Sequence, residues 1–326
     1  MTPRPPIAAG ERSYPSTVTI RDVGPRDGLQ PEAPVPVSER IRLVEALQDA
    51  GLRHIEVTAF VSPRAVPAMA GAAEVLAGIT RRPGSVYAAL VPNERGAQMA
   101  LDAVVDELTV TISASEVYNQ RNVNMSTAES ETAIAAIVGY ARSAHVTHSI
   151  EGPVPVDAVI SCAFGSPYEG ETDPAEVVAL GRRLIEVGVD TVTYADTTGM
   201  ATPRRIDDLI DALGGAVDGV GLHLHDTRGT ALVNAYAALE RGITRFDTAV
   251  GGLGGSPFAH GAGGNLATES LVALLDDIGI DTGIDVLKLI AAAKLIESLV
   301  GRPVPSGIAH HGPRLAEPIS GDPTTA

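Results

Sequence analysis

Short runs of β-branched and apolar residues alternate along the chain with longer stretches in which apolar residues recur every three or four positions. The short runs are typical of strands buried in a parallel sheet, and the longer stretches are typical of amphipathic helices. Eight such pairs follow one another, with strands expected at residues 17–23, 53–60, 85–91, 106–113, 156–164, 190–196, 219–226 and 245–250. One more helical stretch, 284–301, follows the eighth pair.

This order predicts an α/β fold, a closed (β/α)8 TIM barrel with an additional C-terminal helix packed outside it. A doubly wound open sheet is the alternative, but it needs a point where the strand order reverses and usually has fewer units. We expect one barrel domain over residues 17–302, since no internal repeat or Gly/Ser linker divides it. Residues 1–16 and 303–326 are rich in Pro, Gly and small polar residues and are predicted to be flexible tails.

Composition excludes several classes of function. The net charge is −16, whereas nucleic-acid binding needs clustered Lys and Arg on the phosphates. No apolar run reaches the roughly 18 residues that a membrane helix requires. The single cysteine, Cys162, rules out an intrachain disulfide framework and suits a reducing cytoplasm. We therefore expect a cytoplasmic protein whose partner is a small molecule, with no nucleic acid and no membrane.

Chemically versatile side chains stand where the predicted strands end. In a (β/α)8 barrel all these ends lie on one rim, and catalytic groups are found there. The residues concerned are Arg26 and Asp27 after the first strand, Glu56 near the end of the second, Asp196 at the end of the sixth, His223 and His225 at the end of the seventh, and Asn265 beyond the eighth.

The two histidines of this set suggest a metal site. His223 and His225 are two positions apart in a strand, so their side chains point to the same face. A His-x-His pair on its own is usually structural, but here a carboxylate and an amide share its rim. Asp27 adds an anionic oxygen and Asn265 a neutral one, and this mixed set suits Mg²⁺ or Mn²⁺ better than structural zinc.

The segment 251–264, which follows the last predicted strand, is rich in glycine. A phosphate-binding loop is a poor interpretation, because no Lys-Ser/Thr signature follows it. We expect instead a lid over the barrel mouth that moves when substrate binds. Ser256 lies in the middle of this segment.

At this point several motifs resemble those of a known family. The sequence is similar to the hydroxymethylglutaryl-CoA lyases, a branch of the TIM-barrel metal-dependent acyl-CoA lyases, over about residues 17–300. The matching stretches are GPRDGLQ (24–30), FVSP (60–63), SCAFGSPYEGE (161–171), ADTTGMATP (195–203), HLHDTRGTALVNAYAAL (223–239) and GLGGSPFAHGAGGNLATE (252–269).

The resemblance implies that a divalent metal, Mg²⁺ or Mn²⁺, is held by Asp27, His223, His225 and Asn265. It also implies that Arg26 polarises the thioester carbonyl of an acyl-CoA substrate and stabilises the enolate. The catalytic set that it implies consists of Arg26, Glu56, Asp196, His223 and the lid residue Ser256. In this set Glu56 and Asp196 position Arg26, the metal or its water.

Ser256 departs from the family pattern. The lid of the family reads Gly-Gly-Cys-Pro, with the cysteine taking part in proton transfer, whereas this chain reads Gly-Gly-Ser-Pro. A thiol titrates near ~8.5 and an alcohol is far less acidic, so serine is a poor direct substitute. Three interpretations stay open: water or another group, such as His260, moves the proton; the substrate differs; or the lyase activity is low.

The resulting prediction is a metal-dependent carbon–carbon lyase that cleaves 3-hydroxy-3-methylglutaryl-CoA, or a close analogue, to acetyl-CoA and acetoacetate by a retro-Claisen reaction. The alternatives are a lyase for another 3-hydroxyacyl-CoA, such as citramalyl-CoA, and a catalytically weak barrel that binds acyl-CoA. The resemblance further implies a homodimer.

Overall fold

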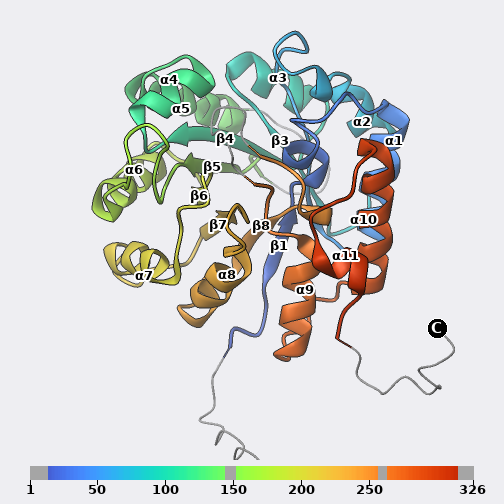
Figure 1. The fold of residues 1–326 in the computed structure, drawn as a ribbon. Coiled ribbons are helices and arrows are strands. Elements are labelled where there is room, and N and C mark those ends of the chain that lie inside the picture. Colours follow the sequence, from blue (N-terminus) through green and yellow to red (C-terminus); the bar gives the residue numbers. More distant parts are fainter. Residues whose placement is uncertain (1–13, 144–151, 256–262, 315–326) are drawn as a thin grey trace, which may run out of the picture.

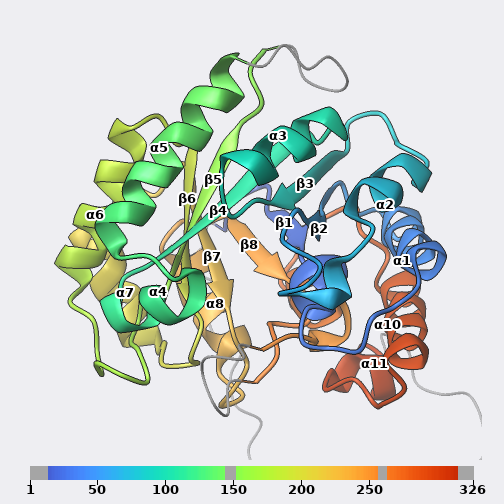
Figure 2. The same ribbon diagram turned by 90° about the horizontal axis from the view of Figure 1, so that it is seen from above.

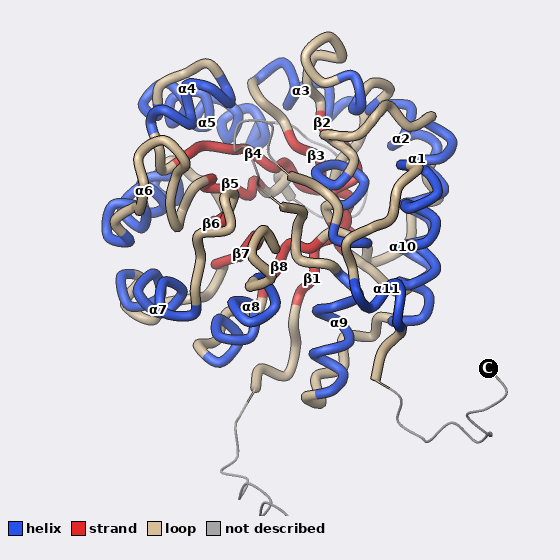
Figure 3. Tube along the Cα trace, in the orientation of Figure 1, coloured by secondary structure: helices blue, strands red, loops and turns tan. Residues whose placement is uncertain are grey.

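The computed structural model describes residues 14–143, 152–255 and 263–314 and shows a closed barrel of parallel strands. The strands surround the centre of the molecule and the helices lie outside them (Figures 1 and 3). The strand order β1-β2-β3-β4-β5-β6-β7-β8 closes through pairing of β1 with β8. The strands are β1 (Thr19–Asp22), β2 (His54–Ala59), β3 (Val86–Leu90), β4 (Glu107–Ser113), β5 (Val156–Ser161), β6 (Thr191–Asp196), β7 (Val220–Leu224) and β8 (Arg245–Thr248). The predicted (β/α)8 fold is therefore confirmed.

Helices cover the outside of the barrel, and most of them begin with a polar cap. Asn93, Asp173 and Thr202 each accept a hydrogen bond from a backbone N–H of the first turn of the helix that follows. The helices are α1 (Val37–Asp49), α2 (Ala72–Gly78), α3 (Glu94–Asp102), α4 (Glu116–Val123), α5 (Thr127–Ser143), α6 (Pro174–Glu186), α7 (Pro203–Ala212), α8 (Ala231–Glu240), α9 (Thr268–Asp277), α10 (Val286–Val300) and α11 (Gly307–His311), with shorter turns η1 (Gly24–Gly28), η2 (Pro67–Met69) and η3 (Val250–Gly252).

The expected extra helix is α10, which packs against α1 on the outside of the barrel (Figure 1). The sequence did not predict α4, which replaces part of the polar loop expected after β4. Ser115 caps α4 by accepting from Tyr118 N. Figure 2 shows α4 and α11 at the end of the barrel toward which the β7 arrow points, so both helices flank the mouth.

Segments near both chain ends, within the stretches expected to be flexible tails, make defined contacts with the barrel. Residues 1–13 and 315–326 lie outside the described residues, but residues 303–314 pack on the barrel. Val304 and Ala309 are buried there, and Ser306 caps α11 by accepting from Ala309 N. At the other end, Tyr14 Oη lies 2.8 Å from Tyr236 Oη on α8. These apolar and capping contacts were not visible in a composition dominated by Pro and Gly.

Among the described residues, no helix is both long enough and apolar enough to cross a lipid bilayer.

Candidate active site and metal centre

The first predicted site residues lie on η1, one turn of π-helix that follows β1. Arg26 is buried and Asp27 is partly exposed. His223 belongs to β7, and His225 follows it by two residues. Asn265 pairs with His225 through an isolated β-bridge. The structure thus brings together the four expected metal ligands, which are separated by up to 238 positions in the chain.

Asp27, His223 and His225 form a cluster with the dimensions of a metal site. One potential ligand atom from each residue lies within 4.8 Å of the other two. The Nε2 atoms of the two histidines are 3.2 Å apart, and Oδ2 of Asp27 lies 3.9 Å from Nε2 of His223. The three groups therefore converge on one point at the rim.

The outer nitrogen of each histidine has its own partner. Nδ1 of His223 lies 3.2 Å from Oδ2 of Asp247, and Nδ1 of His225 lies 3.0 Å from the carbonyl oxygen of Gly263. Both partners are acceptors, so each Nδ1 carries a proton, and each ring, when it is neutral, keeps its lone pair on Nε2. Two lone pairs facing each other at this distance require a shared proton or a cation between them, as in metal sites with outer partners on the histidines.

Asn265 completes the set and provides a test of fit. Its Nδ2 donates to Oδ2 of Asp27 at 2.8 Å and to the carbonyl oxygen of Leu253 at 2.9 Å. Its Oδ1 is buried and has no hydrogen-bond partner among the described residues. A buried amide oxygen without a donor is costly. Together with one carboxylate and two imidazole nitrogens, it fits a divalent cation.

The pKa values in this cluster are perturbed in opposite directions. Burial lowers the pKa of His223, but its hydrogen bond to Asp247 and the charge of Asp27 outweigh this effect and raise the pKa. Burial, and then the charge of His223, lower the pKa of His225 to about 4, so this ring is neutral at physiological pH. Burial opposes ionisation of Asp27, but Arg26 and the two histidines outweigh it and lower the pKa of this carboxyl. Neutral imidazole and ionised carboxylate are the forms that bind metal.

Arg26 is fixed by two carboxylates. Its Nη1 donates to Oδ1 of Asp27 at 2.5 Å, and its Nε donates to Oε2 of Glu56, which is fully buried in β2. Burial opposes the charge of Arg26, yet both carboxylates raise its pKa. The hydrogen bonds found for this guanidinium in the described part of the chain use Nε and Nη1, and Nη2 is left for a ligand at the mouth.

Asp196 ends β6 as expected, and its carboxylate holds the loop that follows. Its Oδ1 accepts from Met200 N at 2.6 Å and from Ala201 N at 3.0 Å, while Oδ2 is buried without a partner among the described residues. Burial raises the pKa of Asp196 to about 6. The positive charge of His223 acts in the opposite direction and lowers this pKa, which indicates that Asp196 lies beside the cluster.

The cluster opens into a cavity of about 570 Å³ at the barrel mouth. Its polar part includes Arg26, Asp27, His223 and His225, together with Gln30, Glu32, Thr111, Asn122, Ser161 and Thr197. Its other part is largely apolar and includes Val61, Ala65, Val66, Pro67, Leu90, Pro92 and Tyr118. A ligand with both polar and apolar parts therefore fits this cavity.

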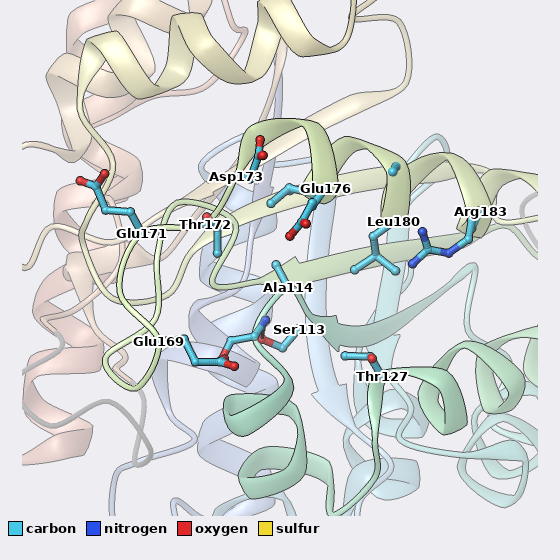
Figure 4. A pocket seen from close by; sticks show the side chains of 13 residues that line it. Ser113, Ala114, Thr127, Glu169, Glu171, Thr172, Asp173, Glu176, Leu180 and Arg183 are labelled. Carbon is cyan, nitrogen blue, oxygen red and sulfur yellow. Dashed lines mark hydrogen bonds between the residues drawn. The ribbon is translucent and has the colours of Figure 1, made fainter.

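A second cavity, of about 600 Å³, lies beside α6 and is mainly acidic (Figure 4). Glu169, Asp173 and Glu176 line it, and its one lining arginine, Arg183, is paired with Glu131. None of the four expected metal ligands reaches it. The chemistry is therefore assigned to the mouth cavity.

Two lid residues of the sequence prediction, Ser256 and His260, lie outside the described residues. Conversely, the prediction missed Asp247 of β8, which contacts His223, and Arg21 of β1, which contacts Asp247. Both are charged residues that are buried within short strands of the barrel, and a charge inside a predicted parallel strand was the available signal.

The fold and the site define the class: a (β/α)8-barrel enzyme with an Asp-His-His cluster suited to a metal ion beside a buried arginine. Comparison with known proteins gives the particular family. The family model described as HMGL-like matches residues 17–296, and the chain belongs to this family.

Individual relatives are similar in sequence to this protein along most of the chain. The chain is 42% identical over 296 residues to a hydroxymethylglutaryl-CoA lyase of Bacillus subtilis, covering 90% of this chain and 96% of the relative. It is 44% identical over 293 residues to a 3-hydroxy-3-isohexenylglutaryl-CoA/hydroxy-methylglutaryl-CoA lyase of Pseudomonas aeruginosa, covering 89% and 95%. A solved structure of an HMG-CoA lyase from Acinetobacter baumannii, in complex with coenzyme A and 3-methylmalate, has a TM-score of 0.86 and 37% identity, covering 93% of this chain and 98% of that one.

Proposed function

We propose that the protein is a metal-dependent lyase that cleaves 3-hydroxy-3-methylglutaryl-CoA to acetyl-CoA and acetoacetate. The observation that carries the proposal is the convergence of the Asp27 carboxylate and two imidazole Nε2 atoms at the mouth, beside the buried Arg26. Family membership and the named activity of relatives more than 40% identical support the substrate class.

Asp27, His223, His225 and Asn265 would hold the divalent ion, Mg²⁺ or Mn²⁺. When bound there, the ion supplies a Lewis acid that makes the substrate's tertiary hydroxyl easier to deprotonate. The chain's own contribution is to keep the ligand groups ready: His225 is neutral, Asp27 is ionised, and the Asn265 amide oxygen accepts no hydrogen bond from the described residues.

Arg26 would act on the other half of the substrate. Breaking the C2–C3 bond leaves negative charge on the thioester oxygen, where a fixed guanidinium stabilises it. Glu56 and Asp27 hold Arg26 in one orientation, and within the described part of the chain no hydrogen bond is found for its Nη2, so little reorganisation is needed when the charge develops. Glu56 thus serves as a positioning residue, and we assign Asp196 the same kind of role at the rim through the loop that it holds.

A proton must then reach C2 to release acetyl-CoA. Ser256 stands at the position of the family's lid cysteine. An alcohol gives up its proton far less readily than a thiol, so we expect a water molecule or His260 to take part, with Ser256 as a hydrogen-bonding group.

The apolar part of the mouth also favours a second candidate substrate within the same reaction. Ala65 is small and stands among Val61, Val66 and Pro67 on the cavity wall. A 3-hydroxyglutaryl-CoA with a branch longer than methyl fits such a wall. The relative in Pseudomonas aeruginosa is named for both kinds of substrate.

The test is acetyl-CoA release by the purified protein from 3-hydroxy-3-methylglutaryl-CoA, with Mg²⁺ or Mn²⁺ and with a chelator as control. Metal-dependent release at an ordinary enzymatic rate supports the proposal. If release is absent while a longer-branched analogue or citramalyl-CoA is cleaved, the substrate assignment moves to that compound. No turnover of any of them, with acyl-CoA still bound, indicates the catalytically weak barrel.

Assembly as a homodimer and a cytoplasmic location are further parts of the proposal. Sedimentation velocity of the purified protein tests the first, and fractionation of the producing cells tests the second.

A further inference from the structure

A row of charged side chains crosses four neighbouring strands inside the barrel. Arg21 of β1 is in register with His54 of β2 on one side and with Asp247 of β8 on the other, and Asp247 is in register with His223 of β7. Residues in register on parallel strands point to the same side of the sheet. The row therefore runs without a break from His54 to the candidate metal ligand His223 (strands labelled in Figure 3).

Arg21 is the centre of this row. It is 3% exposed and lies among three carboxylates. Its Nε donates to Oδ1 of Asp247 at 2.7 Å and its Nη2 donates to Oδ2 of the same carboxylate at 2.8 Å. Its Nη1 donates to Glu107 at 2.9 Å, and Nη2 also lies 2.8 Å from Asp157. The two parallel hydrogen bonds from Nε and Nη2 to Asp247 fix the plane of its carboxylate, which a single hydrogen bond would not do.

The fixed plane has a consequence for His223. Oδ2 of Asp247 is the atom that accepts from Nδ1 of His223 at 3.2 Å. The imidazole is thereby held with its proton on Nδ1, and Nε2 points at His225 and Asp27. If Asp247 turned away, the proton of the ring could sit on either nitrogen.

A charged layer in this place is unusual. The interior of a (β/α)8 barrel is normally filled by branched apolar side chains. Burying ions carries a desolvation cost, so a buried ion pair is weak support for a role in stability alone. This network ends on His223, a ligand of the candidate metal centre, so it can serve the reaction centre as well as the stability of the fold.

We propose that Arg21 and Asp247 are positioning residues of the reaction centre: Arg21 clamps the Asp247 carboxylate, and Asp247 sets the tautomer and direction of His223. The inference rests on the proposed function in so far as His223 is a metal ligand, but its first test needs neither metal nor substrate.

The first test reads the tautomer directly. The metal-free protein is labelled with [¹⁵N]histidine and its two-bond ¹H–¹⁵N correlation spectrum is recorded, with the His223 signals assigned from their loss in His223→Gln. Recorded at a pH high enough for both rings to be neutral, wild type should show the Nδ1–H form. In Asp247→Asn the amide offers an N–H as readily as an oxygen, so the Nε2–H form should gain population. In Arg21→Met the carboxylate is no longer clamped, and the same change should follow.

The second test measures Mn²⁺ affinity by electron paramagnetic resonance without substrate. Loss of an outer partner of a metal-bound histidine typically costs roughly 10–100-fold in affinity, so Asp247→Asn and Arg21→Met should weaken Mn²⁺ binding by at least about tenfold. Arg21→Lys keeps the charge without the paired contact and should recover part of the loss.

Arg245→Met is the matched control. Arg245 lies 3.9 Å from Asp157 in the same carboxylate cluster, and no contact with Asp247 is found among the described residues. This variant removes a nearby cation but should leave the His223 tautomer unchanged. Its Mn²⁺ affinity should stay within about twofold of wild type, a much smaller change than the loss expected when an outer partner of the histidine is removed.

The outcomes are distinct. Folded Arg21→Met and Asp247→Asn proteins with a wild-type His223 tautomer and Mn²⁺ affinity overturn the inference. If Arg21→Met does not fold, Arg21→Lys and Asp247→Asn decide. If the tautomer shifts as expected while wild type releases no acetyl-CoA, the proposed function fails and the positioning role stands.

Discussion

A Cβ atom on Gly254 would lie 2.3 Å from Nδ2 of Asn265. The same atom would be 3.3 Å from Oδ2 of Asp27. The backbone of Gly254 also has a φ of +117°, which L side chains rarely adopt. The approach of Asn265 to Asp27 therefore depends on the absence of a side chain at residue 254.

Gly254→Ala is expected to displace Asn265 and so to weaken both metal binding and turnover. Gly84→Ala is the control, because Gly84 also has a positive φ, of +73°, but a Cβ there meets nothing within 4 Å. Both variants should lose about 1–2 kcal/mol of stability from backbone strain. Only Gly254→Ala should lose Mn²⁺ affinity and acetyl-CoA release. Equal turnover in the two variants would show that the Asn265 position is unimportant.

Asp27→Ala is expected to remove metal-dependent turnover and to leave the fold intact. Asp27 lies at the rim and is partly exposed, so no core cavity results. Without its charge the two Nε2 atoms keep a much weaker hold on a cation. Isothermal titration with Mn²⁺, a thermal melt and the acetyl-CoA assay check the three parts, with Asp102→Ala on the surface of α3 as control. Near-normal turnover would refute the ligand assignment.

The sequence predicted the barrel because each strand and helix carries its own periodic signal, and the order of the units leaves few topologies. It also predicted that Arg26, Asp27, His223 and Asn265 lie at one rim, since each follows a strand or lies near its end, whereas Glu56 is the third residue of β2. In both cases a local signal and a general rule of the fold were sufficient.

The sequence was less informative where the contact partner lies far along the chain. Arg21 and Asp247 are 226 residues apart, and nothing local to either residue indicates that they form a pair. The role of Asp196 as a cap of its own loop was missed because the free N–H groups of Met200 and Ala201 appear only once that loop is folded. Helix α4 was not predicted because its residues are mostly polar.

Ser256→Cys is expected to raise the cleavage of 3-hydroxy-3-methylglutaryl-CoA. A thiol near pKa ~8.5 is a better proton donor than an alcohol, and general acid–base groups contribute about 10²–10⁴-fold, so a gain of about tenfold or more is reasonable. Steady-state kinetics at saturating metal measure it. Ser298→Cys, on the exposed side of α10, controls for a new thiol. No gain, or a loss, would mean that the site is adapted to another substrate.

Asp22→Asn is expected to flatten the dependence of stability on pH. Asp22 is fully buried, and burial raises its pKa to about 7 against the opposing hydrogen bonds from Thr268 and Gly24. An unfolded aspartate loses its proton near pH ~4. Between these values the folded protein binds more protons than the unfolded chain, so this group makes the free energy of unfolding fall as pH rises.

The magnitude follows from the same linkage. One proton corresponds to about 1.4 kcal/mol per pH unit, so the stability of Asp22→Asn relative to wild type should rise by up to this amount for each unit between about pH 4 and pH 7. Carboxylates with lowered pKa values, such as Asp247, act in the opposite direction in both proteins and cancel in the difference. Urea unfolding at a series of pH values, with surface Asp102→Asn as control, measures it. Parallel curves for wild type and Asp22→Asn would mean that Asp22 is ionised in the folded barrel.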